Sequence, residues 1–411
     1  MKKINQLKIK TRLLLIKLLR HCLNISILII VSPFCILVMA ISPLMVIRFG
    51  TLMSSRIGHF AADTEAYLCS KDIEIRSRVV IDIIGCSAKT CNHQLKTMWS
   101  RTLKLWPAPS LINAMDMGCI FWSNGSKKHH ISLYNRGPDY RLFSVTRSHI
   151  EFTEQEEELG KKLMHELGID PEKNWICIHN RDDAYLEALF KRKVSYHDYR
   201  NYSIGSMLKA AEALTKKNYY VIRVGSVVNE RLNTKNQLIV DYANCKLRSD
   251  FLDVYILAKC KFFLGSESGI WAIPLIFRKP IALVNFTLLS NFYDKNYQPW
   301  YVILKHFWHK KLQRYLSIRE IFELGLDGAG HSEIYEQADV KLIENSNQEI
   351  MDIAEEIEER TSGRWRELQL DCDLQNRFQM ILRDFAPKNF QGEITIRIGT
   401  TFLRENSYLL N

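Results

Sequence analysis

One stretch near the middle of the chain, residues 175–225, constrains the fold more than any other. It holds two short apolar runs, Trp175 to Ile178 and Tyr219 to Val224, of the kind that buried parallel strands show. Between them, residues 204–216 carry apolar side chains at helical spacing. Strand, helix and strand in this order predict a right-handed crossover unit, which is the building block of a parallel sheet.

Polar residues follow these apolar runs where the predicted strands end. A third apolar run, Phe262 to Gly265, likewise leads into the loop from Ser266 to Gly269. In an open α/β sheet, ligands bind beyond the carboxyl ends of the strands. Small residues and hydroxyls at a strand-to-helix turn leave backbone N–H groups available for an anion. The residues expected to line this rim are His179, Arg181, Asp182, Asp198, Arg200, Asn201, Arg223, Gly225, Ser266, Glu267, Ser268 and Gly269.

Several arginines beside a loop of glycine and serine favour a diphosphate as the ligand of this rim. Guanidinium groups bind phosphate oxygens in pairs and stabilise the charge of a leaving diphosphate. A surface network of Arg and Asp ion pairs is the alternative. We favour the anion site because polar residues follow predicted buried strands in two places and a third such loop contains glycine.

Alternating strands and helices are also predicted before this stretch, over residues 44–140. A helix with a capping box of Thr153 and Glu156 follows and ends at Gly168. The expected fold class is therefore α/β, with two domains built on parallel sheets and a membrane-associated helix at the N-terminus. The expected divisions are a basic anchor at residues 1–43, a first domain at 44–168, a second domain at 169–345, and C-terminal helices with a tail at 346–411. The first of these last helices opens at Ser346 and is expected to return to the first domain.

The motif R-I-G-H-F contains the candidate catalytic base. Gly58 permits a close approach of the backbone, and His59 follows it near the start of a predicted helix. An imidazole titrates near neutral pH, so His59 can accept a proton or hold a phosphate. A capping or packing histidine is the alternative interpretation. Asp63 and Glu65 are the rival bases, and helical spacing places them on different faces.

The N-terminal segment carries the one localisation signal of the sequence. The chain has a formal net charge of +11, and its first twenty residues hold seven of the positive charges, at Lys2, Lys3, Lys8, Lys10, Arg12, Lys17 and Arg20. Ile25 to Ala40 is apolar and uncharged, so we expect attachment to an anionic membrane surface. A partly embedded helix and a single spanning helix, kinked at Pro33, both fit a run of this length. Because the basic excess lies in one arm, no nucleic-acid partner is expected.

The cysteines indicate the cellular compartment, and the acidic motifs bear on whether the protein needs a metal ion. The ten cysteines are scattered without a C-x-x-C pair, so we expect them to be reduced and the domains to face the cytosol. The motif D-C-D at Asp371 and Asp373 lies in a segment predicted to be helical, away from the predicted strand ends. No metal ion or other cofactor is therefore expected, and arginines would take the place of a metal.

Four groups of motifs resemble a family of bacterial glycosyltransferases associated with surface-polysaccharide synthesis. They are R-I-G-H-F with D-T-E-A-Y-L, H-N-R-D with Y-H-D-Y-R-N, Y-Y-V-I-R-V-G, and C-K-F-F-L-G-S-E-S-G, and the match runs from about Leu44 to Trp365. The resemblance implies the GT-B architecture, in which two Rossmann-like domains face each other. In that architecture the first domain would hold the acceptor, and the second would hold most of the nucleotide sugar.

One of these motifs also resembles a second family. The H-x-R element of H-N-R-D is similar to the H-x-R-x-G-D motif of fucosyltransferases, whose arginine holds the donor diphosphate. Carried over, that role falls to Arg181. Asp182 and Asp183 stand where those enzymes have arginine or glycine, so the resemblance does not extend to fucose as the donor sugar.

Two functions fit these observations. The first is metal-independent transfer of a hexosyl or deoxyhexosyl group from a nucleoside-diphosphate sugar to a lipid-linked or growing surface glycan, with His59 and Arg181 as catalytic residues. Its place would be the bacterial inner membrane, with the catalytic domains facing the cytoplasm. The alternative is a non-catalytic membrane-bound protein that binds nucleotide sugars or takes part in polysaccharide assembly.

Overall fold

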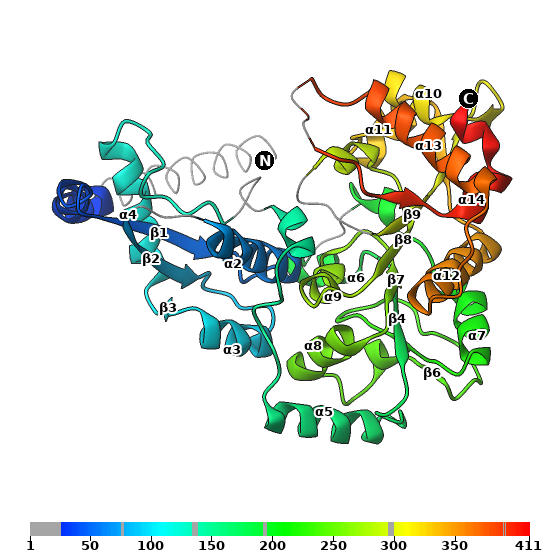
Figure 1. Cartoon of the computed structure of the whole chain (residues 1–411), viewed down its shortest axis with the longest axis horizontal. Coiled ribbons are helices and arrows are strands. Elements are labelled where there is room, and N and C mark those ends of the chain that lie inside the picture. The colour runs from blue at the N-terminus through cyan, green and yellow to red at the C-terminus, as the bar shows by residue number, and fades with distance from the viewer. Residues whose placement is uncertain are drawn as a thin grey trace, which may run out of the picture.

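The computed structural model describes residues 26–74, 78–133, 139–191, 195–294, 300–388, 390 and 392–411. These residues form two lobes, each built around a parallel sheet, and residues 139–153 lead from the first lobe to the second (Figure 1). The fold class is therefore α/β, as the sequence predicts.

The larger sheet belongs to the second lobe. Its strands, in spatial order, are β13 (Arg397–Ile398), β9 (Tyr301–Leu304), β8 (Ile281–Phe286), β7 (Phe263–Gly265), β4 (Trp175–His179), β5 (Tyr220–Arg223) and β6 (Ile239–Val240). Every described pairing in it is parallel. Counted from β4, and leaving out the edge strand β13, the order is 3-2-1-4-5-6, which is the doubly wound Rossmann order. The order reverses between β4 and β7, where such sheets bind ligands.

Helices cover both faces of this sheet, with α7 and α12 on one side and α8 and α9 on the other (Figure 1). The α-helices of the second lobe are α5 (Glu154–Glu166), α6 (Ala184–Phe190), α7 (Leu208–Lys216), α8 (Asp250–Lys259), α9 (Ala272–Ile276), α10 (Ile318–Glu323), α11 (Ser332–Gln337), α12 (Asn347–Thr361), α13 (Gln369–Asp384) and α14 (Thr400–Glu405). Short 3-10 turns are η3 (Asp198–Arg200), η4 (Ile204–Met207), η5 (Tyr242–Asn244), η6 (Gly269–Trp271), η7 (Leu289–Tyr293) and η8 (Ser407–Leu410). A small antiparallel sheet adds β10 (His306–His309), β11 (Arg314–Tyr315) and β12 (Val340–Ile343).

The first lobe has a smaller sheet of the same kind. Its strands are β1 (Met45–Leu52), β2 (Val79–Cys86) and β3 (Leu105–Trp106), all parallel, and an isolated parallel bridge from Phe49 to His130 extends it beyond β1. Its helical segments are the π-helical turn η1 (His59–Asp63), α2 (Thr64–Ile73), α3 (His93–Thr102), α4 (Pro109–Trp122) and the 3-10 turn η2 (Tyr140–Ser144). The bridge and the three strands follow the 3-2-1-4 part of the Rossmann order, so this lobe is a reduced version of the second.

Most of the predicted elements are confirmed close to their expected ends. The capping box of Thr153 and Glu156 is present at the start of α5, and Gly168 ends this segment with a φ of +77°. The crossover unit predicted from residues 175–225 consists of β4, η4 with α7, and β5. One feature differs: α12 packs against α7 in the second lobe instead of returning to the first.

Residues 26–40 form a helix that lies against α4 of the first lobe. No helix within the described ranges combines the length and the apolar composition that crossing a membrane requires. Residues 1–25 of the expected anchor lie outside the described residues.

Candidate active site

The carboxyl ends of β4, β5 and β7 lie at one edge of the larger sheet. In the strand register, His179 of β4 is opposite Gly265 of β7, and Ile178 is opposite Arg223 of β5. A Cβ atom at Gly265 would lie 2.9 Å from the backbone oxygen of His179, so glycine permits this close strand approach. The loops that leave the three strands therefore begin together at the switch point, as the sequence predicts.

Arg181 leaves β4 just beyond its end, and only 9% of its surface is exposed. Its Nη1 donates hydrogen bonds to the backbone oxygen of His197, at 3.1 Å, and to Oδ1 of Asn201. Burial, and then the nearby charge of Arg200, lower the pKa of Arg181 to about 10. Because both acceptors are neutral, the guanidinium is desolvated without an ionic partner at its hydrogen-bonding nitrogen, and an anion would relieve that cost.

Arg200 and Glu267 bring η3 and the β7 loop to the same place. Arg200 Nη1 lies 4.0 Å from Glu267 Oε1, which also accepts a hydrogen bond from Asn291. Burial raises the pKa of Glu267. Four buried polar atoms in this group have no hydrogen-bond partner among the described residues: His197 Nδ1, Arg200 Nε, Glu267 Oε2 and Ser268 Oγ. Since buried polar atoms are normally paired, this concentration marks a place where a polar ligand would complete the contacts.

Ser268 occupies a position where a serine side chain usually forms a hydrogen bond within the protein. It stands at the N-cap of η6, yet its side chain forms no capping hydrogen bond. An N-cap serine normally accepts a hydrogen bond from the backbone two or three residues ahead. The hydroxyl of Ser268 is thus available to a ligand at the rim, close to the buried Ser266.

Arg223 is placed differently from the other two arginines. It is fully buried, and its terminal nitrogens donate to Glu230 backbone oxygen at 2.6 Å, to Asp241 Oδ1 at 3.2 Å and to Asn180 Oδ1 at 3.2 Å. These contacts fix the end of β5 to the loop after β4, next to Gly225. Arg223 Nε has no partner among the described residues, but both terminal nitrogens are engaged by protein groups, which makes Arg223 a positioning residue for the rim.

Other predicted rim residues also serve the loops. Asp182 accepts hydrogen bonds from the backbone N–H groups of Ala184 and Asn229. His179 contacts the backbone oxygen of Val224 through Nδ1, and burial lowers its pKa to about 4, so its ring is neutral. The amide nitrogen of Asn201 donates to Asp198, while the amide oxygen accepts from Arg181. Together these residues hold the arginines in place.

The two lobes meet at two glycines that the sequence analysis selected. A Cβ atom at Gly58 would lie 3.0 Å from Cα of Gly269, and one at Gly269 would lie 3.1 Å from the backbone nitrogen of Gly58. Either substitution would therefore push backbone against backbone. The turn η1 also packs against α9. The contact places His59, the next residue, beside the loop that carries Ser268.

His59 begins the π-helical turn η1 and is held by a carboxylate. Its Nδ1 lies 3.0 Å from Oδ2 of Asp63, and 36% of its side-chain surface is exposed. Asp63 is buried, and its other oxygen accepts a hydrogen bond of 2.6 Å from the Tyr140 hydroxyl. A histidine oriented by a carboxylate that is fixed in turn is the arrangement of a general base. Asp63, one of the rival bases, is therefore the residue that orients His59.

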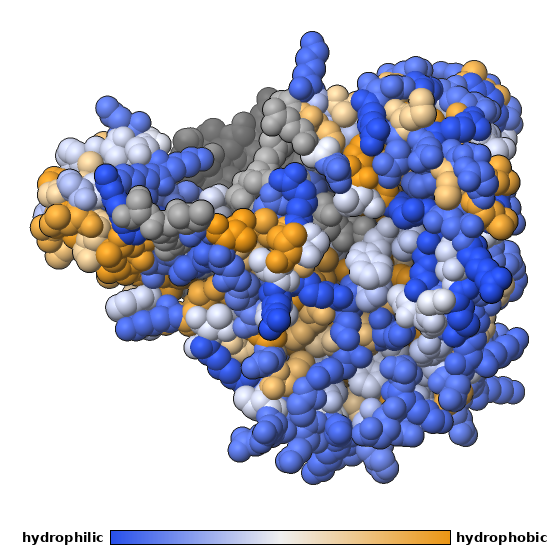
Figure 2. Space-filling model, viewed as in Figure 1, coloured by the Kyte–Doolittle hydropathy of each residue, from blue (hydrophilic) through white to orange (hydrophobic). Residues whose placement is uncertain are grey.

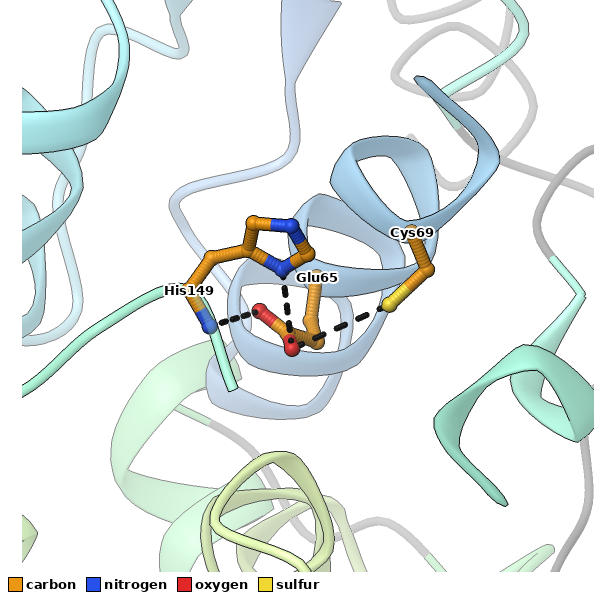
Figure 3. A group of neighbouring side chains, drawn as sticks. All are labelled: Glu65, Cys69 and His149. Atoms are coloured by element: carbon orange, nitrogen blue, oxygen red, sulfur yellow. Dashed lines mark hydrogen bonds and ion pairs between the residues drawn. The ribbon is translucent and has the colours of Figure 1, made fainter. Parts of the chain in front are cut away.

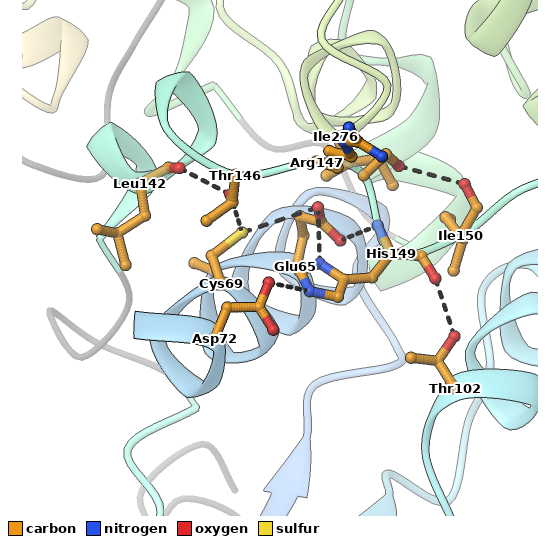
Figure 4. A network of polar contacts seen from close by, with 12 residues as sticks. Glu65, Cys69, Asp72, Thr102, Leu142, Thr146, Arg147, His149, Ile150 and Ile276 are labelled. Carbon is orange, nitrogen blue, oxygen red and sulfur yellow. Dashed lines mark hydrogen bonds and ion pairs between the residues drawn. The ribbon is translucent and has the colours of Figure 1, made fainter. Parts of the chain in front are cut away.

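Glu65, the second rival base, lies in a buried network between the lobes (Figures 3 and 4). Its Oε1 contacts His149 Nδ1 at 3.2 Å, Cys69 Sγ at 3.8 Å and Arg278 Nη2 at 2.6 Å. The hydrogen bonds of His149 with Glu65 and then with Asp72 raise its pKa. Glu65 is on α2 of the first lobe, Arg278 follows α9 of the second, and His149 lies between the lobes. The network therefore ties η1 and α2 to the second lobe.

Glu65, Cys69 and His149 also have the spacing of a metal site, since their donor atoms lie within 4.8 Å of one another. The guanidinium of Arg278 lies 2.6 Å from Glu65 Oε1 and 3.6 Å from Cys69 Sγ. It brings a positive charge to two of the three donors. In addition, burial raises the pKa of the Cys69 thiol to about 11, which disfavours the thiolate that a metal needs. The cluster is therefore better described as a hydrogen-bonded brace.

Lys305 is a rim residue that the sequence analysis missed. It follows β9, is 4% exposed, and donates a hydrogen bond of 2.9 Å to the backbone oxygen of Asn201. Burial lowers its pKa to about 8. A lysine at the end of the apolar run Y-V-I-L was the available signal. Lys305 supports the segment that binds Arg181, and His197 was missed as well.

A cavity of about 780 Å³ lies away from this rim. It is lined by Trp308, Tyr315 and Tyr408, with Arg314 and Arg319 at its wall. Arg314 pairs with Glu320, and Arg319 pairs with Asp384. Because its arginines are paired, it lacks the unsatisfied polar groups that distinguish the strand-end rim.

Comparison with known proteins completes the description of the site. No family model and no curated protein sequence matches the chain. Among solved structures, a glycosyltransferase family 9 protein of Veillonella parvula resembles it with a TM-score of 0.35 and 11% identity, over 58% of this chain and 79% of that one. The ADP-heptose lipopolysaccharide heptosyltransferase II of E. coli resembles it with a TM-score of 0.32 and 10% identity, over 57% and 83%. A likeness of this extent does not define a family or an activity for the chain. The protein is thus of a class defined by its fold and rim: a two-lobed α/β protein with a Rossmann-type sheet and an arginine-lined rim at its switch point.

Proposed function

We propose that the protein is a glycosyltransferase that takes a hexosyl or deoxyhexosyl group from a nucleoside-diphosphate sugar. The observation that supports this most is the rim itself, where Arg181 and Arg200 lie with partnerless buried polar atoms at the switch point of the larger sheet. Guanidinium groups in a desolvated site bind a diphosphate strongly and stabilise its charge as it leaves. In this proposal the second lobe holds the donor, and the first lobe holds the acceptor.

The acceptor hydroxyl would approach from the first lobe, past His59. In the proposed reaction the imidazole of His59 takes the proton of that hydroxyl while the oxygen bonds to the sugar carbon. The bond from that carbon to the diphosphate oxygen breaks, and the diphosphate leaves with the electron pair. Asp63 stabilises the imidazolium through the Nδ1 contact of 3.0 Å. This relay supports an enzyme over a protein that only binds nucleotide sugars.

The proposed acceptor is a lipid-linked or growing surface glycan, and the proposed place is the cytoplasmic face of a bacterial inner membrane. Support for this placement comes from the basic N-terminal segment and from the donor, because nucleotide sugars are made in the cytosol. A reporter fused after Asn411 that is active only in the periplasm would contradict it.

The proposal predicts turnover without a divalent metal. Purified protein incubated with UDP-, GDP-, CDP- and ADP-sugars should release the nucleoside diphosphate from one class of donor, slowly with water and faster with a glycan acceptor. EDTA should leave this rate unchanged, because arginines supply the charge that a metal would supply. Binding without any release would favour the non-catalytic alternative. A rate abolished by EDTA and restored by Mn²⁺ would contradict metal independence.

A further inference from the structure

The helix over residues 26–40 has an apolar surface on all sides. Its buried stripe of Val31, Cys35 and Val38 packs toward α4, where a Cβ at Gly118 would lie 2.6 Å from Cys35 Sγ. Most of its remaining circumference is exposed, with Ile30 68% and Phe34 60% exposed. No charged residue occurs from Ile25 to Ile47. A helix that is hydrophobic all round is normally buried, so its exposed side calls for an apolar partner.

The exposed side continues onto α4, so the apolar surface is shared by two helices. Met117 is 63% exposed and Phe121 is 60% exposed. Trp122 donates a hydrogen bond of 2.9 Å to Ser32, which fixes the two helices to each other. Figure 2 shows hydrophobic surface gathered at the end of the molecule formed by the first lobe. The exposed large apolar residues of this docking face are Ile27, Ile29, Ile30, Phe34, Ile36, Leu37, Leu44, Leu111, Met117, Phe121 and Trp122.

Charge at the edge of the docking face identifies the kind of partner. Seven positive charges precede the helix within the first twenty residues of the chain, and the chain enters the docking face at Ser26. Lys128 is exposed, and its Nζ donates a hydrogen bond of 2.9 Å to the Ser42 hydroxyl, just past the C-terminal end of the helix over residues 26–40. The one acidic residue of α4, Asp116, is paired with His130 at 2.9 Å. An apolar face with Trp and Phe side chains, in a chain with a strongly basic N-terminal sequence, is the pattern of a surface that enters an anionic lipid interface.

We propose that this docking face binds the surface of an anionic lipid bilayer, with the helix over residues 26–40 and α4 both in contact with the acyl region. Val31 and Cys35 attach the helix along its length to the first lobe, so the face brings the whole lobe to the bilayer. This inference adds a defined lipid-binding surface to the proposed reaction and does not depend on it. The alternative occupants of the docking face are a second copy of the chain and the chain's own N-terminal segment.

Vesicle sedimentation of the full chain tests the proposal. Wild-type protein should pellet with vesicles of phosphatidylcholine containing about one third phosphatidylglycerol, and at least about tenfold less with phosphatidylcholine alone. The double variant Phe34→Asp, Phe121→Asp should reduce binding to the anionic vesicles about tenfold or more, because each change puts a charge into the acyl region. The matched control is Leu324→Asp, Met380→Asp, which alters exposed apolar residues of the second lobe and should bind as wild type does.

A third variant separates charge from apolar contact. Replacing the seven N-terminal basic residues with glutamine should remove most of the preference for anionic vesicles and leave the weak binding to neutral ones. Wild-type protein that stays in the supernatant with both vesicles would overturn the proposal. A double variant that pellets as well as wild type would also overturn the proposal. That result would assign the docking face to the chain's own N-terminal segment. A wild-type dimer in solution that does not pellet, and that the double variant dissociates, would assign the face to a second copy.

Discussion

Arg181→Ala should weaken binding of the nucleoside diphosphate by about thirtyfold or more, which corresponds to about 2 kcal/mol. The reason is that Arg181 is 9% exposed and its Nη1 donates to two neutral acceptors, so a diphosphate would add a direct ionic contact to the nearby charges of Asp198 and Glu267. Isothermal titration with the nucleoside diphosphate that the turnover assay selects gives the affinity. Arg181→Lys keeps the charge but loses the planar fork of donors, and its affinity should fall between those of the alanine variant and wild type.

Arg319→Ala is the matched control for Arg181→Ala. Arg319 is about half exposed in an ion pair with Asp384 and lies away from the rim. Its removal should leave the affinity unchanged. If Arg181→Ala retains a wild-type melting temperature and a wild-type affinity, the diphosphate does not bind at Arg181, and Arg200 is the next residue to test.

His59→Ala should lower kcat by about a hundredfold or more and change donor affinity by only a few fold. His59 contacts Asp63 in the first lobe, whereas the donor groups lie in the second, so its loss removes proton transfer and leaves the diphosphate contacts in place. Steady-state rates and titration of the same preparation measure the two effects separately. Asp63→Asn should also lower kcat, because it removes the carboxylate that stabilises the imidazolium.

His93→Ala is the control for His59. His93 is exposed on α3 of the same lobe, and it contacts Asp250 through its backbone nitrogen, which the substitution preserves. It should turn over at the wild-type rate. A normal rate in His59→Ala would refute the base assignment. A parallel loss of donor affinity and rate would instead mean that His59 holds a phosphate.

The sequence predicts the second lobe well because its strands are nearly continuous apolar runs. Trp175 to Ile178 is buried on both faces of the sheet, and such a strand has a pattern that few other elements share. The rim follows from the same pattern, because polar residues after such strands must lie at their carboxyl ends.

What the sequence could not predict is which charged side chains already have partners. Arg181 and Arg223 look alike in sequence, but Arg223 binds Asp241, whereas Arg181 binds neutral groups. Tyr140 reaches Asp63 from far along the chain, and Arg278 reaches Glu65 from the other lobe. These contacts depend on how the lobes pack, and the local spacing of residues in the sequence does not predict that packing. The direction of α12 is of the same kind, since its packing against α7 is a tertiary contact.

The central claim is that the rim at the switch point between β4 and β7 binds a nucleoside diphosphate. A crystal structure of the wild-type protein with the diphosphate selected in the turnover assay tests it most directly. Phosphate oxygens should lie within hydrogen-bonding distance of Arg181 and Arg200, and Ser268 Oγ should donate to one of them, which would satisfy atoms that now lack partners. A diphosphate bound elsewhere, such as in the cavity beside Trp308, with the rim unchanged, would contradict the claim.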